Sequence, residues 1–139
     1  DLNWEKNYDG RKQELKQEAT TIQIKNNMCT KIVDGRELAK SKIKGDLKYS
    51  NYERQKLGEF VGLMRLSKYG STIFIKRYEE LINSHIGSFH DAPSISQAYF
   101  TDMLQELIDN DIEILPIPVQ GKWCEIDTIE DLKRAGDMF

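Results

Sequence analysis

Alternation of apolar and polar positions predicts a β-hairpin early in the chain. Residues 20–25 are rich in β-branched side chains that alternate with polar ones, and strand composition resumes over residues 29–33. Asn26 and Asn27 lie between these two segments, where turn chemistry is needed. We therefore expect two antiparallel strands joined by a tight turn.

Further apolar runs predict strands in the middle and near the end of the chain. The run over residues 59–66 is almost continuously apolar, as expected for a central strand with both faces covered. Residues 112–119 and 123–126 also have strand composition. Pro116 and Pro118 have no amide N–H, and in a strand both residues would face the same neighbouring strand. One side of this strand therefore cannot pair fully, so we place residues 112–119 at a sheet edge.

Three segments have the apolar spacing of helices that bury one face. Ser67 can cap the first, which should end near Gly87, and residues 94–97 have capping-box spacing ahead of the second. The third helix closes the chain. The expected buried faces are, in chain order, Phe74, Tyr78, Leu81 and Ile82; then Phe100, Met103, Leu104, Leu107 and Ile108; and finally Leu132, Ala135 and Phe139.

Two polar segments lack a period that would bury one face. Residues 1–18 are polar apart from isolated aromatics at Trp4 and Tyr8, which predicts a surface arm or a short helix. Residues 36–56 are rich in lysine and predict a solvated loop, with a basic lid over a phosphorylated substrate as the alternative. The alternation of all these elements predicts an α/β fold, a partial mixed sheet with flanking helices.

Composition describes one ordinary globular domain. The chain has 139 residues, of which 39% are hydrophobic and 31% charged, so it can bury a substantial core. A net charge of -3 gives no attraction to nucleic acid or an anionic membrane, and no apolar run has the length of a membrane span. Cys29 and Cys124 lack the spacing of a zinc site or a disulfide scaffold, so a cytoplasmic location is expected.

The carboxylates at the start of the last helix are the clearest candidate chemistry. Asp127 lies where a strand is expected to run into a helix, near the positive end of that helix, and open α/β proteins commonly bind ligands there. Thr128 followed by Asp131 also fits a capping box, with Asp in place of the usual Glu. Residue types alone favour the cap over a metal site, because caps are far more common.

Several segments, in this order, resemble the later half of a nucleotidyltransferase domain. They are Gly58-Glu59-Phe60-Val61-Gly62-Leu63, residues 98–108, and Trp123-Cys124-Glu125-Ile126-Asp127-Thr128-Ile129-Glu130-Asp131-Leu132. The likeness is to the phosphocholine and 2-aminoethylphosphonate cytidylyltransferases and to the nucleotidyltransferase domains fused to phosphoenolpyruvate mutase. The opening residues 1–4, with Tyr8 and Arg11, are similar to the segment that follows the first metal-binding Asp in that family.

The resemblance implies a divalent metal site that this chain only completes. In the family an Asp of the Glu-Ile-Asp-Thr motif, here Asp127, joins an Asp from the first half to bind Mg²⁺. Glu125 is a plausible second contact to the metal or the substrate. The family's glycine-rich nucleotide-binding loop matches nothing in residues 1–139. We therefore expect residues 1–139 to be the acceptor-binding, metal-completing portion of a nucleotide-diphospho-sugar-transferase-like (Rossmann-like) domain, inactive by itself.

Three further residues have implied roles in binding the acceptor. Trp123 lies on the same strand face as Glu125 and suits an ammonium head group through cation–π attraction, with a core aromatic as the equal alternative. Glu59 resembles a residue that faces the acceptor pocket, the alternative being a solvated strand end. Lys31 is near the place of a phosphate-binding lysine, although that place matches Asp34 better.

The implied reaction transfers a nucleotide to a small phosphorylated or phosphonate acceptor. The donor would be CTP or another NTP, the acceptor a molecule such as phosphocholine or 2-aminoethylphosphonate, and the second product pyrophosphate. An alternative within the same class is an enzyme that uses UTP or dTTP as the donor and a sugar phosphate as the acceptor. The competing class is a non-catalytic interaction module, possible as a homodimer, whose interface would use the edge near Pro116 and Pro118.

Overall fold

The computed structural model describes residues 1–8, 19–34, 56–120 and 123–138. Within these residues the chain forms a three-stranded antiparallel sheet and three α-helices, which confirms the α/β class. The elements in chain order are η1 (Trp4–Tyr8), β1 (Thr20–Lys25), β2 (Met28–Asp34), β3 (Lys56–Glu59), α4 (Lys68–Ser84), η3 (Ile95–Gln97), α5 (Phe100–Asp109) and α6 (Ile129–Met138).

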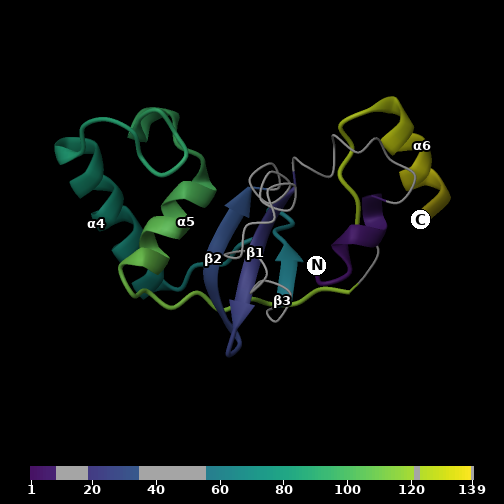
Figure 1. Ribbon diagram of the computed structural model, residues 1–139, viewed down its shortest axis with the longest axis horizontal. Coiled ribbons are helices and arrows are strands. Elements are labelled where there is room, and N and C mark those ends of the chain that lie inside the picture. The colour runs from purple at the N-terminus through teal and green to yellow at the C-terminus, as the bar shows by residue number, and fades with distance from the viewer. Residues whose placement is uncertain (9–18, 35–55, 121–122, 139) are drawn as a thin grey trace, which may run out of the picture.

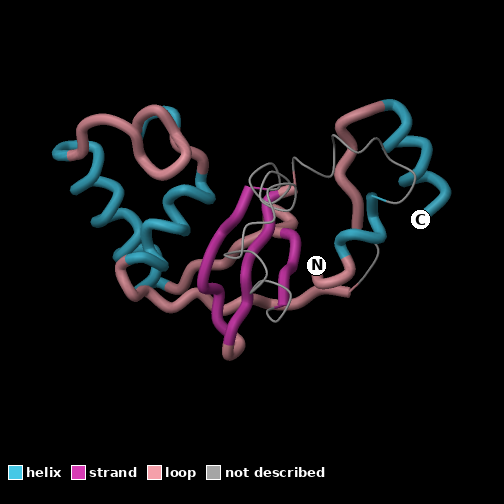
Figure 2. The backbone as a smooth tube through the Cα atoms, in the orientation of Figure 1, coloured by secondary structure: helices cyan, strands magenta, loops and turns pink. Residues whose placement is uncertain are grey.

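Helices lie on both sides of the small sheet (Figure 1). The strand order is β2-β1-β3, and β1 pairs antiparallel with both neighbours. In Figure 2, α4 and α5 lie beyond β2, whereas η1, α6 and both chain ends lie on the side of β3. None of the described helices is long and apolar enough to cross a membrane.

The predicted hairpin is confirmed. Asn26 and Asn27 have φ angles of 52° and 63°, the left-handed conformation that a two-residue turn between twisted strands requires. Asparagine reaches this region more readily than most side chains. On β1, Thr21 is completely buried, and its Oγ1 donates to the Val33 carbonyl oxygen at 3.0 Å. The turn sets the register beside it, with Lys25 opposite Met28, and an irregularity between Gln23 and Ile24 shifts the register of the remaining pairs by one residue.

The other predicted strands are wrong in extent or absent. β3 ends at Glu59, the Phe60 nitrogen makes one more bond to the Thr20 oxygen of β1 at 2.8 Å, and the chain then leaves the sheet, with Gly62 at a φ of 75°. Residues 112–119 and 123–126 form no strand in the structure. A strand exists only where a neighbouring strand exchanges backbone hydrogen bonds. Among the described residues, residues 112–119 have one backbone bond to the sheet, from the Cys29 nitrogen to the Ile114 oxygen at 2.9 Å, and one to the end of α5, from the Ile112 nitrogen to the Leu107 oxygen at 2.9 Å.

The predicted helices are present, with differences in their caps and buried faces. Ser67 caps α4 as expected, since its Oγ accepts from the Gly70 nitrogen at 2.9 Å. The capping box expected at residues 94–97 is wrong: these residues form η3, and α5 starts later, where the Asp102 carboxylate accepts from the Tyr99 nitrogen at 2.7 Å. η3 and α5 are therefore separate elements, and the predicted cap position belongs to η3 alone.

The predicted buried faces are confirmed for most of α5 and for a smaller part of the other helices. Met103, Leu104 and Leu107 are buried on α5. The exceptions are exposed side chains that were expected to be buried: Tyr78 and Ile82 on α4, Phe100 on α5, and Leu132 on α6. Phe139 and the lysine-rich segment, apart from Lys56, lie outside the described residues. The short sheet covers too little area to bury every apolar stripe.

The main core is the contact between α4 and α5. Leu81, Phe89, Met103 and Leu107 are buried together, and Phe74 packs against them. At the edge of this core, Glu106 binds several donors at once. Its Oε1 accepts from Arg77 Nε and Nη2 at 2.9 and 2.6 Å and from Asn110 Nδ2 at 2.9 Å, and its Oε2 pairs with His90 Nε2 at 3.0 Å.

The charge on Glu106 contributes to stability at neutral pH. Burial alone would raise the pKa of the Glu106 carboxyl, but the hydrogen bonds from Arg77 and His90 outweigh it and hold the pKa below its ordinary value. A carboxylate with a lowered folded-state pKa stabilises the fold above its unfolded pKa. That contribution is lost as the pH falls through the folded value.

Glu106→Gln should lower the free energy of unfolding by about 1–3 kcal/mol near neutral pH, because buried donors lose a charged acceptor. The difference from wild type should shrink as the pH falls below the ordinary pKa of a glutamate. Urea denaturation across this pH range measures both. Glu80→Gln is the matched control, since Glu80 also pairs with Arg77 but is half-exposed, and it should change stability by less than about 0.5 kcal/mol. Equal effects of the two substitutions at every pH would contradict this role.

Candidate functional site

A buried carboxylate at the end of β3 connects the N-terminal segment to the sheet. Glu59 is 3% exposed, and its Oε1 accepts from the Tyr8 hydroxyl. Trp4 and Tyr8 are both buried and pack edge to face, with ring centroids 6.0 Å apart. The expected short helix is therefore confirmed as η1, but its aromatic side chains face the interior and not the solvent. The interpretation of Glu59 as a solvated strand end is wrong.

Asp1 continues the sheet beside Glu59. The Asp1 nitrogen donates to the Glu59 carbonyl oxygen at 2.7 Å, and the Glu59 nitrogen donates to the Asp1 carbonyl oxygen at 2.9 Å. This double exchange is the pattern of a hydrogen-bonded pair in an antiparallel ladder.

The Asp1 carboxylate connects the first residues of the sequence to Trp123. Its Oδ1 accepts from the Asn3 nitrogen at 2.8 Å, and its Oδ2 accepts from Asn7 Nδ2 at 3.2 Å. The same Oδ2 accepts from Trp123 Nε1 at 2.7 Å. Trp123 is thus held by its indole nitrogen, with its side chain only partly covered. Glu59 and Trp123, expected to share an acceptor site, are brought together through Asp1.

The start of α6 is capped as the sequence predicted. The Asp131 Oδ2 atom accepts from the Thr128 nitrogen and Oγ1 at 3.0 and 2.8 Å, and the Asp131 nitrogen donates to Thr128 Oγ1 at 3.1 Å. Arg134 Nη2 lies 2.8 Å from Asp131 Oδ1. Asp131 is 1% exposed and forms the capping box reciprocally with Thr128.

Asp127 is left with an exposed carboxylate. Only its backbone nitrogen bonds to the cap, with a distance of 3.3 Å to Asp131 Oδ2. Its side chain has no hydrogen bond or ion pair with the described residues. Glu125, two residues earlier, is also exposed. The part of the chain that the structure describes contains no group of three potential metal ligands, so these carboxylates do not form a complete metal site by themselves.

Lys31 lies apart from the other candidate residues. It belongs to β2, the strand farthest from η1 and α6 in Figure 1. It borders a polar hollow beside α5 that also includes Asp102, Gln105 and Asp109. The structure therefore does not bring Lys31 to Asp127 or Trp123.

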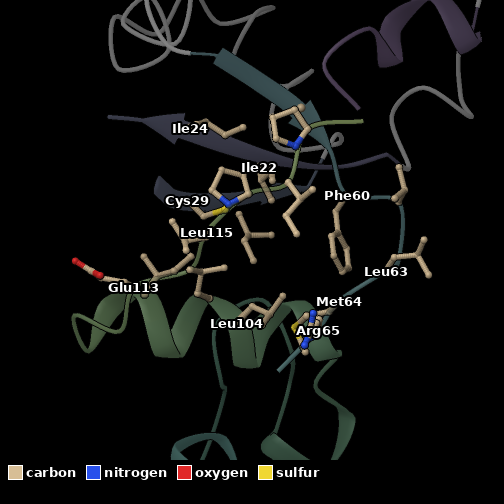
Figure 3. A pocket seen from close by; sticks show the side chains of 18 of the residues that line it. Ile22, Ile24, Cys29, Phe60, Leu63, Met64, Arg65, Leu104, Glu113 and Leu115 are labelled. Carbon is tan, nitrogen blue, oxygen red and sulfur yellow. The ribbon is translucent and has the colours of Figure 1, made fainter. Parts of the chain in front are cut away.

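An apolar groove lies between one face of the sheet and α5 (Figure 3). It has a volume of about 440 Å³, and Asp1 and Glu59 are among the residues at its border. Side chains from the sheet, α5 and residues 60–66 face the same space. The apolar lining includes Ile22, Ile24, Cys29, Phe60, Leu63 and Leu104. Burial raises the pKa of the Cys29 thiol above its ordinary value.

Sequence reasoning missed Asp1 and Tyr8 as members of this site. The opening residues 1–4 and Tyr8 had a resemblance to a family segment, but no role was inferred for them. The only available signal was an aromatic pair at a spacing of four residues, which suits one face of a helix turn. No family model matches the chain, and no match was found among curated proteins or among solved structures.

Tyr8→Phe should lower the free energy of unfolding by about 1–3 kcal/mol, because the buried Glu59 carboxylate loses the hydroxyl donor. Tyr99→Phe is the matched control, since the Tyr99 side chain is 77% exposed, and it should change stability by less than about 0.5 kcal/mol. Urea denaturation of the three proteins measures both values. A Tyr8→Phe protein as stable as the control would show that this hydrogen bond does not support the site.

Proposed function

We propose that this chain is the acceptor-binding, metal-completing portion of a cytidylyltransferase-like nucleotidyltransferase. The observation that supports it most is that Asp131 and Asp127, at the start of α6, have different environments. Asp131 is buried and makes the cap, so Asp127 is not needed for the cap and keeps an exposed carboxylate. The resemblance of residues 123–132 to the family motif supports a metal-binding role for Asp127.

The donor chemistry at Asp127 fits a hard divalent cation. Mg²⁺ prefers carboxylate oxygens and retains several waters, so one or two acidic ligands from each side of a site are sufficient. Asp127 would supply one of them, with Glu125 as the second candidate from this chain. When bound, Mg²⁺ would neutralise the charge that develops on the phosphates during nucleotidyl transfer.

Trp123 is the candidate contact for the head group of the acceptor. Its indole nitrogen is fixed by Asp1, so the orientation of the ring is set before any ligand arrives. An indole ring near a carboxylate attracts an ammonium group, which phosphocholine and 2-aminoethylphosphonate both carry. Glu59 is covered by Tyr8 and acts as a positioning residue, because it holds Asp1 by its backbone. Lys31 remains a sequence-based prediction for phosphate binding.

A second candidate function is a non-catalytic interaction module. It is favoured by the apolar groove and by the exposed apolar side chains that border it, since such surfaces mark protein interfaces. A fragment of a sugar-phosphate nucleotidyltransferase is the third candidate. Pyrophosphate release from CTP and Mg²⁺ by a polypeptide that also carries a nucleotide-binding half separates the first two classes, because a non-catalytic module would release none.

The isolated 139-residue chain should be catalytically inactive, because the residues that bind the nucleotide in the resembled family have no counterpart in it. Incubation with CTP, Mg²⁺ and either phosphocholine or 2-aminoethylphosphonate should release no pyrophosphate above the rate without protein. Turnover by the isolated chain would disprove the assignment of residues 1–139 to one portion of the enzyme.

In a polypeptide that also carries a nucleotide-binding half, Asp127→Asn should reduce Mg²⁺-dependent pyrophosphate release roughly a hundredfold or more, because a charged ligand is lost. Its free energy of unfolding should stay within about 0.5 kcal/mol of wild type. Asp131→Ala is the control for the fold and should cost about 1–3 kcal/mol, because buried donors of the cap lose their acceptor. Full activity of Asp127→Asn would contradict the proposal that Asp127 binds the metal.

A further inference from the structure

Residues 112–119 form an extended segment that has one backbone edge turned toward β2. After α5 this part of the chain runs past the sheet toward the side of β3 (Figure 1). The Ile114 carbonyl oxygen accepts from the Cys29 nitrogen of β2 at 2.9 Å. In an extended chain the amide and carbonyl groups of alternate residues point to opposite edges. Ile114 therefore shares its edge with Pro116 and Pro118.

Because Pro116 and Pro118 alternate with Ile114, whose carbonyl oxygen bonds to β2, they share its edge, and the opposite edge keeps all of its donors. Its residues are Glu113, Leu115, Ile117 and Val119, each with an amide N–H and a carbonyl oxygen. None of these backbone groups bonds to any residue that the structure describes. The segment thus has one edge that cannot form a full ladder and one edge that can.

Three of the four residues along the complete edge, Leu115, Ile117 and Val119, have apolar and exposed side chains. Leu115 is 71% exposed and Ile117 is 82% exposed, and both border the apolar groove. An unpaired strand edge with exposed apolar side chains is a template for pairing with another strand. The adjoining Leu63 is 82% exposed and extends the apolar surface.

The sequence of this edge is complementary to itself. If two copies pair antiparallel about Pro116, Leu115 of one copy lies opposite Ile117 of the other, and Glu113 lies opposite Val119. Each of these positions exchanges both backbone hydrogen bonds, while Pro116 occupies a position that needs no donor at this edge. No like charges lie directly opposite each other, and apolar pairs occupy the centre. A two-fold axis through Pro116 satisfies the symmetry of a closed dimer.

We propose that residues 113–119 pair with the same residues of a second copy of this chain, forming an antiparallel two-stranded ribbon at the centre of a symmetric dimer. The pairing satisfies the backbone groups of the complete edge and covers Leu115 and Ile117. It goes beyond the proposed nucleotidyltransferase function, because it uses none of the acceptor or metal residues.

Sedimentation equilibrium over a wide range of protein concentration tests the dimer directly. The 139-residue chain should associate to a dimer, and Ile117→Pro should be monomeric at the same concentrations because it removes a donor from the paired edge. Pro118→Ala is the matched control, since it changes only the edge that faces β2, and it should dimerise like wild type. Circular dichroism and urea denaturation establish that each variant is folded.

Hydrogen exchange provides a second readout that does not depend on a variant. The amides of Leu115 and Ile117 should become more protected as the protein concentration rises, whereas the amide of the exposed Leu63 should not change. A monomer at all concentrations would overturn the proposal and leave the edge for a strand of another protein. A dimer that persists in Ile117→Pro with unprotected amides at Leu115 and Ile117 would overturn it as well.

Discussion

The burial of the Glu59 carboxylate is the constraint on which the candidate site depends. A carboxylate that is 3% exposed is tolerated only where donors replace water, and the Tyr8 hydroxyl is one of them. The backbone of the same residue holds Asp1, and the Asp1 carboxylate holds Trp123. Glu59, at the end of β3, therefore holds η1 directly and, through Asp1, holds Trp123 in the segment that leads to α6.

The features that the sequence predicted well are those that neighbouring residues determine. The turn at Asn26 and Asn27 and the Thr128–Asp131 box each depend on a few consecutive residues, and all are present. The apolar stripe of α5 is equally local. Strands depend on partners, and residues 112–119 have the composition of a strand without a neighbour to complete it.

The candidate site was harder to predict because its contacts join distant parts of the chain. The bond between Trp123 and Asp1 spans 122 positions, and the bond between Tyr8 and Glu59 spans 51. No periodicity in one sequence indicates such pairs. Glu59 and Trp123 were selected through a family resemblance. In the structure Glu59 is buried, so it is not the solvated strand end that was the alternative. The sequence left open whether the carboxylates at the start of α6 form a helix cap or a metal site. In the structure the cap uses the Asp131 side chain, and the Asp127 side chain takes no part in it.

The exchange rate of the Trp123 indole N–H, measured by NMR, tests most directly whether Glu59 and Asp1 attach the C-terminal arm to the sheet. The indole proton should exchange slowly in the wild-type chain, because it is donated to the Asp1 carboxylate at 2.7 Å. Asp1→Ala should make it exchange much faster while the amides of α5 stay protected. A Trp123 indole that exchanges as fast as a free indole in the wild-type chain would contradict this coupling.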